Sequence, residues 1–115
     1  EANKPIRLDN VNFDINSYEL DDISKSNINQ LVEFMKANTE VKITLHGHTD
    51  NSGTTEYNVQ LSEQRVEEVK NFMCSQGISY NRISFKGFGE KVPLATNLTK
   101  KGRAINRRVE FVIKP

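Results

Sequence analysis

The stretch from Val41 to Arg65 constrains this chain most, because a strand pattern, a turn pattern and a helix pattern follow one another within it. Apolar and polar residues alternate up to His46, which predicts a strand with one buried and one polar face. The residues from Gly47 to Gly53 tolerate left-handed geometry or bond to their own backbone, which predicts a tight turn. A helical pattern follows, so the turn can hold Asp50 in a fixed pose ahead of Arg65.

The remaining patterns predict further strands and helices in alternation. The predicted elements are a strand over 6–13, a helix from the N-cap Ser17 to about Asn38, a strand over 41–46, a helix over 55–76 closed by Gly77, a strand from Ile83 to the glycines at 87 and 89, a loop over 90–102 and a strand over 109–113. Strands that alternate with helices of this length favour a layered α/β sheet with helices packed over it.

Length and charge limit the possible functions. A chain of 115 residues fits one domain, so we expect a single unit over residues 1–115. The 16 basic and 15 acidic residues give a net charge of +1, so no global field indicates nucleic acid or an anionic membrane. The apolar runs are too short to span a bilayer and residues 1–5 do not resemble a signal peptide, so we expect a soluble piece of a longer protein. The single cysteine, Cys74, is expected to be an apolar filler on a helix.

Asp50 and Arg65 are the first candidates for binding. An arginine fork binds a carboxylate through two parallel hydrogen bonds, and an aspartate accepts a hydrogen bond from an ammonium. The pair could therefore flank a cleft that binds a zwitterionic ligand. Two other interpretations stay open from spacing alone. Asp50 could be a turn aspartate that accepts from backbone amides, and Arg65 could be a helix-surface charge paired with Glu68 or Asp50.

A longer series of motifs gives more information than the spacing of Asp50 and Arg65 alone. It comprises Gly47-His48-Thr49-Asp50, Gly53, Asn58, Leu61-Ser62, Arg65, Gly77-Ile78, Arg82, Gly87-Phe88-Gly89, Pro93, Asn97, Gly102-Arg103-Ala104 and Asn106-Arg107-Arg108-Val109-Glu110, with Val11 and Phe13-Asp14 near the start. In this order the residues resemble the OmpA-like peptidoglycan-binding domain nearly from end to end. The resemblance implies an α/β (α+β) fold, a βαβαβ-type mixed sheet of about four strands covered by two main helices.

The resemblance also implies a function and a site. It implies a periplasmic domain of a Gram-negative outer-membrane or envelope protein that binds the stem peptide of peptidoglycan without cleaving it and without a cofactor. Asp50 and Arg65 match the two positions that hold the head group of diaminopimelate in the family. Further positions match the pocket lining or its wall, and these are Asn16, Asn58, Arg107, Thr49, Phe13 and Asp14.

The ligand that the family binds agrees with the chemistry of the pair. The free end of diaminopimelate carries an ammonium beside a carboxylate, whereas a stem ending in lysine lacks that carboxylate and would leave Arg65 without its partner. We expect modest affinity for a single site, with tethering to a polymeric wall raising the effective concentration. Outer-membrane barrels, peptidoglycan-associated lipoproteins and flagellar stator proteins carry similar domains, and any membrane attachment would come from a segment outside this chain. The sequence distinguishes neither these parents nor an oligomeric state.

Two rival functions remain as alternatives. His46, His48 and Asp50 alternate as metal ligands do at a strand end, so a metal-dependent hydrolase is one alternative. The basic segment 100–108 could bind nucleic acid or a protein, although no aromatic stacking platform accompanies it. No serine or cysteine is paired by spacing with a histidine, so we predict a binding module and not an enzyme.

Overall fold

The computed structural model describes residues 5–12 and 18–114, and within them strands and helices alternate. The elements are β1 (Ile6–Asn12), α1 (Asp22–Ala37), β2 (Lys42–His48), α2 (Thr55–Ser75), the 3₁₀ turn η1 (Tyr80–Arg82), β3 (Ile83–Gly89), α3 (Lys100–Asn106) and β4 (Arg108–Lys114). Most predicted bounds agree with these to within one or two residues.

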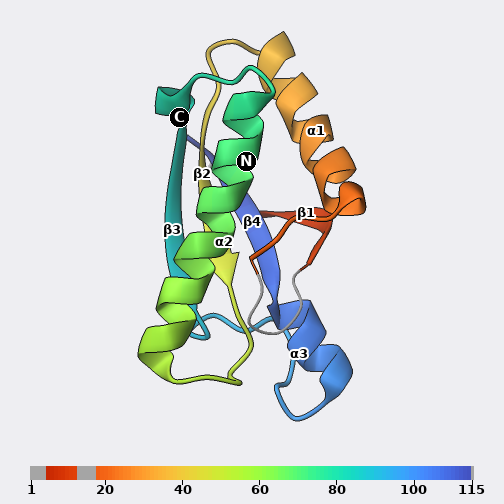
Figure 1. Cartoon of the computed structure of the whole chain (residues 1–115), viewed down its shortest axis with the longest axis vertical. Helices are drawn as coiled ribbons and strands as arrows, with labels where there is room; N and C mark the ends of the chain where they lie inside the picture. The colour runs from red at the N-terminus through yellow and green to blue at the C-terminus, as the bar shows by residue number, and fades with distance from the viewer. Residues whose placement is uncertain (1–4, 13–17, 115) are drawn as a thin grey trace.

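The strands form one mixed sheet in the order β1-β4-β2-β3 (Figure 1). β2 and β3 run parallel, with Gly47 opposite Gly87, and α2 connects them as the crossover helix. β4 lies between β1 and β2 and is antiparallel to both. This confirms the predicted α/β fold, a four-stranded mixed sheet covered by two main helices.

The core lies between the sheet and the helices α1 and α2. Apolar residues recur at helical spacing on both helices and alternate on the strands, so each element turns one face inward. The buried members include Ile28, Leu31, Val32, Met35, Ile43, Leu45, Val66, Val69, Met73, Val109 and Phe111. Most of these positions follow the strand alternation and the helical period of the sequence.

The start of α1 corrects one prediction. The helix begins at Asp22, and its N-cap is Asp21, whose Oδ1 accepts a hydrogen bond of 2.7 Å from the amide of Ser24. The predicted cap, Ser17, was therefore wrong and lies outside the described residues. An aspartate is well suited here because its carboxylate accepts from a backbone amide that has no partner within the helix. Its negative charge is also stabilised by the positive end of the helix dipole. The hydrogen bonds from Ser24 lower the pKa of Asp21.

The helix α3 was also missed, because the predicted loop over 90–102 runs into it. Thr99 caps this helix by accepting from the amide of Gly102 at 2.9 Å. Gly102 has no room for a side chain, since a Cβ there would overlap the carbonyl oxygen of Thr96. The buried Asn106 side chain accepts from the amides of Leu94 and Ala95 and so fixes the preceding loop against α3.

The longest described helix, α2, packs very closely on the sheet. A Cβ added at Gly47 would lie 2.5 Å from the carbonyl oxygen of Ser62, and one at Gly87 would lie 2.5 Å from the Ser62 hydroxyl. That hydroxyl donates to the carbonyl of Val59 and accepts from the amide of Gly89 at 3.0 Å. Glycines on two strands thus let α2 approach the backbone of the sheet.

The ends of α2 match the sequence signals. Thr54 caps the start by accepting from the amide of Tyr57, and Gly77 follows the end with a left-handed φ of 108°. The helix is 21 residues long but carries charged residues along its length. Among residues 5–12 and 18–114, no helix has the length and apolar character needed to cross a bilayer.

We predict that Gly47→Ala lowers the free energy of unfolding by about 1–3 kcal/mol, because the added methyl forces α2 away from the sheet. Urea denaturation followed by circular dichroism measures this loss. Gly53→Ala is the matched control, since the added carbon there meets side chains and no backbone: the ring of Tyr57, which is 42% exposed and can move, and Oδ1 of Asn58 at 3.0 Å. Equal losses in the two variants would contradict this account of the packing.

Candidate functional site

Asp50 sits directly beyond the end of β2 and is 4% exposed. Its Oδ1 accepts from the amide of Ser52 at 2.9 Å, as expected of a turn aspartate. Its Oδ2 accepts from Nη1 of Arg107 at 2.6 Å, which forms an ion pair across 57 residues of sequence. Asp50 is therefore both a turn residue and a member of a charged site.

The turn that carries Asp50 is fixed from both sides. The backbone amide of Thr49 donates to the carbonyl of Gly89 at 2.9 Å, and its hydroxyl donates to the carbonyl of Asp50. Thr49 and Asp50 are both buried. The turn is thus tied to the end of β3, and the carboxylate keeps a defined position.

Arg65 lies on α2 and is 1% exposed, so the interpretation as a solvated surface charge was wrong. Burial and the positive charge of Arg107 lower the pKa of Arg65 to about 10, while Asp50 and Tyr57 act in the opposite direction. The guanidinium therefore stays protonated at neutral pH. These mutual effects mean that Asp50, Arg65 and Arg107 form one electrostatic cluster at the end of the sheet.

The cluster keeps Asp50 ionised. Burial alone raises the pKa of Asp50, but the hydrogen bonds from Ser52 and Arg107 and the charge of Arg107 outweigh it, so the pKa lies below its ordinary value. Arg107 caps the end of α3 immediately before β4, with 14% of its side chain exposed. One carboxylate thus faces two guanidinium groups.

The other predicted site residues differ in how the structure places them. Asn58 is buried on α2, and its Nδ2 donates to the carbonyl of Gly53 and, at 2.8 Å, to Oε1 of Glu90. The amide of Asn58 therefore holds the Asp50 turn and a residue after β3 together, a role that spacing did not predict. Phe13, Asp14 and Asn16 lie outside the described residues.

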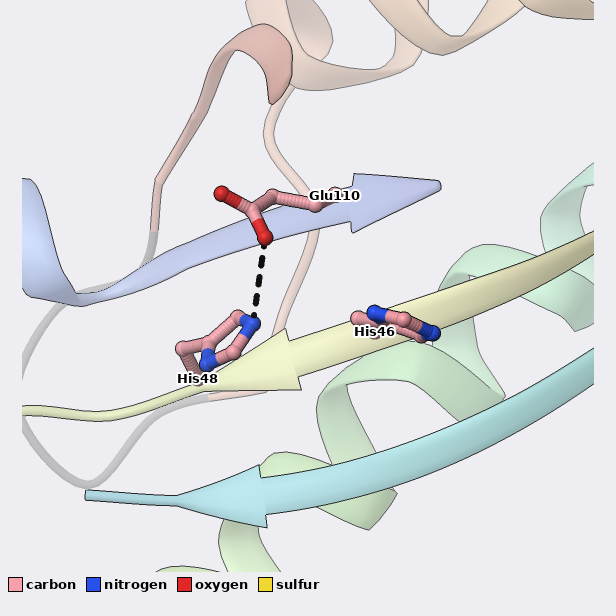
Figure 2. Close-up of side chains that lie close together, drawn as sticks. All are labelled: His46, His48 and Glu110. Carbon is pink, nitrogen blue, oxygen red and sulfur yellow. Dashed lines mark ion pairs between the residues drawn. The ribbon is translucent and has the colours of Figure 1, made fainter. Parts of the chain in front are cut away.

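The two histidines form a separate cluster with Glu110, shown in Figure 2. His46 pairs with Glu110 across β2 and β4, and Nε2 of His48 lies 3.4 Å from Oε1 of Glu110. The predicted metal set of His46, His48 and Asp50 is corrected, because Glu110 and not Asp50 completes the described group of close ligand atoms. Sequence reasoning missed Glu110, since cross-strand pairing is not visible in the order of residues.

The ring of His48 is 2% exposed and stacks on Phe88, with ring centroids 5.3 Å apart. Burial and the charge of Arg108 lower the pKa of His48 to about 4, and the attraction of Glu110 only partly opposes them. Burial also lowers the pKa of His46. Both rings are therefore neutral at physiological pH.

The basic segment 100–108 does not form one continuous basic surface. Arg108 is 1% exposed; its Nε donates to Glu110 at 3.0 Å and its Nη2 to the carbonyl of Val92. Arg103 donates to the carbonyl of Asn97, and Arg107 belongs to the Asp50 cluster. Nucleic-acid binding by this segment is not supported.

The fold and this site together define an OmpA-like domain. The model of the OmpA family matches residues 12–107, and the chain belongs to that family. The crystal structure of the peptidoglycan-associated lipoprotein from Burkholderia pseudomallei matches with a TM-score of 0.86 and 29% identity, covering 90% of this chain and 88% of that one.

Curated relatives are similar in sequence over most of the chain. Outer membrane porin F from Pseudomonas aeruginosa is 41% identical over 110 residues, which cover 95% of this chain and 31% of the porin. Peptidoglycan-binding protein ArfA from Mycobacterium tuberculosis is 37% identical over 86 residues, 75% of this chain and 26% of that protein. The chain thus spans about a third or less of the length of these two relatives.

We predict that the ring of His48 titrates near pH 4 in the folded protein, well below the ordinary value of 6.5. The unfolded chain takes up this proton first, so stability should fall as the pH drops from about 6.5 toward 4, with no contribution from His48 above that window. An NMR titration of the two histidine rings, with a chelator present, measures both values. A His48 pKa at or above 6.5 would contradict the environment described.

Proposed function

We propose that this domain binds peptidoglycan without cleaving it and recognises the diaminopimelate of the stem peptide. Membership of the OmpA family supports this proposal, as do two relatives whose names contain peptidoglycan, the Burkholderia lipoprotein and ArfA. The observation that carries the proposal is the buried cluster of Asp50, Arg65 and Arg107 at the end of β2. A metal-dependent hydrolase is not favoured by the family.

The charges of the cluster match the free end of diaminopimelate. Asp50 would accept from its ammonium, and Arg65 would donate its fork to the neighbouring carboxylate. Because both side chains are almost fully buried, their charges are poorly screened by water and their hydrogen bonds count for more than on an open surface. The ligand would supply one charge of each sign to groups that are already desolvated.

Arg107 adds a reason for selectivity. It holds Oδ2 of Asp50 in this structure, so an incoming ammonium must share or displace that contact. The positive charge of Arg107 therefore disfavours a lone ammonium, as on the side chain of a lysine in the stem peptide, whereas the zwitterionic end of diaminopimelate brings a carboxylate that an arginine can bind.

The remaining assignments complete the pocket. We assign Thr49 and Asn58 to its wall, where they fix the turn that presents Asp50. From the family resemblance we also assign Phe13, Asp14 and Asn16 to the pocket. The name of outer membrane porin F supports a periplasmic place for this domain in a Gram-negative envelope, where it would anchor a longer parent protein to the wall.

We predict that Asp50→Asn and Arg65→Lys each lower binding to purified sacculi by about tenfold or more. Asp50→Asn removes the negative charge that accepts from the ammonium. Arg65→Lys keeps the positive charge but loses the bidentate fork. Each loss removes about 1.4 kcal/mol or more of binding free energy. Pull-down with sacculi and calorimetric titration with meso-diaminopimelate measure the effect. Stem tripeptides ending in diaminopimelate and in lysine are the matched ligand and control, because free lysine carries an α-ammonium beside an α-carboxylate of its own.

Glu67→Gln is the matched control variant, because Glu67 is exposed on the same helix as Arg65. Circular dichroism must show that each variant is folded, since Arg65 is buried. Binding to sacculi as strong as that of the wild type, in both Asp50→Asn and Arg65→Lys, would contradict the assignment of the site. Loss of binding in the control variant as well would indicate a nonspecific electrostatic interaction.

We predict that Arg107→Gln narrows the preference for a stem peptide ending in diaminopimelate over one ending in lysine by about tenfold, roughly 1.4 kcal/mol of binding free energy. The variant removes the guanidinium that competes with an ammonium for Asp50. Calorimetric titrations with the two stem tripeptides give the ratio of affinities. Lys101→Gln, an exposed change in the same basic segment, should leave that ratio unchanged. An unaltered ratio in Arg107→Gln would exclude Arg107 as a source of selectivity.

A further inference from the structure

The His46, His48 and Glu110 side chains lie on the sheet face that points away from α2. Gly47, between the two histidines, faces Ser62 of α2, so the alternation of the strand turns both rings to the opposite side. Glu110 reaches the same side from β4, beside His46 (Figure 2). Ligand atoms of the three side chains all lie within 4.8 Å of one another.

The two ring nitrogens of His48 are buried without the hydrogen bonds that buried polar atoms normally make. Neither ring nitrogen has a hydrogen-bond partner among residues 5–12 and 18–114, although the ring is 2% exposed. The contact of 3.4 Å to Glu110 does not have hydrogen-bond geometry. Buried polar groups are normally satisfied, and a buried imidazole whose nitrogen points at a carboxylate and near a second imidazole is suited to a metal ion.

We propose that His46, His48 and Glu110 bind a divalent transition-metal ion of the Zn²⁺ class, independently of the peptidoglycan site. Two imidazoles and one carboxylate are a ligand set typical of zinc, and the remaining coordination position would be filled by water. Ligand atoms on one Zn²⁺ lie roughly 3.3 Å apart, given metal-to-ligand distances of about 2.0–2.1 Å, so small side-chain rotations would close the site. His46 is only partly buried and gives the ion access from solvent.

The surroundings both orient the site and limit its affinity. Arg108 donates to Oε2 of Glu110 and so holds the carboxylate with Oε1 toward His48, as an outer partner of a metal ligand does. The same guanidinium and the ammonium of Lys86 place positive charge near the ion. We therefore expect binding weaker than in structural zinc sites. The ion would link β2 to β4 two residues before Asp50.

Titration of the 115-residue chain with Zn²⁺, in a Cys74→Ser background that removes the one thiol, tests this proposal. We expect one ion per chain, movement of the NMR signals of both histidine rings, and a rise in Tm of a few degrees at saturation. The two rings are diagnostic because His46 and His48 are the only histidines of the sequence. Less than one ion per chain at saturating Zn²⁺, or an unmoved His48 ring, would overturn the proposal.

His46→Ala should weaken Zn²⁺ binding by at least about tenfold, since outer partners of metal ligands alone account for that much. The partly buried position of His46 makes this the variant most compatible with folding, and Tm without metal verifies it. Asp50→Asn should bind Zn²⁺ as the parent does while losing sacculi, which separates the two sites. Unchanged Zn²⁺ affinity in His46→Ala, or equal weakening by Asp50→Asn, would refute the assigned ligands.

Discussion

The close approach of α2 to the sheet through Ser62 is the contact on which the rest of the structure depends. The glycines at 47, 87 and 89 belong to two neighbouring strands, and each leaves room or donates a backbone group to the same serine. Arg65 follows Ser62 by one turn, so the contact that seats the helix also sets the depth of the guanidinium. A bulkier residue at these positions would move α2 outward and bring Arg65 toward solvent.

The same packing explains how opposite charges can be buried at the end of β2. A buried charge is costly unless other charges and hydrogen bonds compensate it. Asp50 receives an amide and a guanidinium, and Arg65 lies in the field of Asp50. The β2 turn and the adjoining α2 supply Asp50 and Arg65, and the distant junction of α3 with β4 supplies Arg107, so the cluster forms only when the sheet is complete.

Much of this could be predicted from the sequence, because the strand alternation and the helix period are local and strong. The bounds of α2 and its closing glycine, Gly77, are examples, and the ordered motifs pointed to Asp50 and Arg65. The helix α3 could not be predicted, since its seven residues contain a glycine and show no apolar period. The burial of Arg65 and the joining of Glu110 to His48 depend on packing and on strand pairing, which spacing along the chain does not encode.

The central place of β2 has a mechanical consequence. A wall polymer held at Asp50 would pull on the end of a strand that is hydrogen-bonded on both sides, to β3 in parallel and to β4 antiparallel. Force along β2 would load two ladders of backbone hydrogen bonds in shear, so many bonds would share the tension instead of opening one after another. An attachment point at the end of an edge strand such as β1 would have only half of this resistance to being drawn out of the sheet.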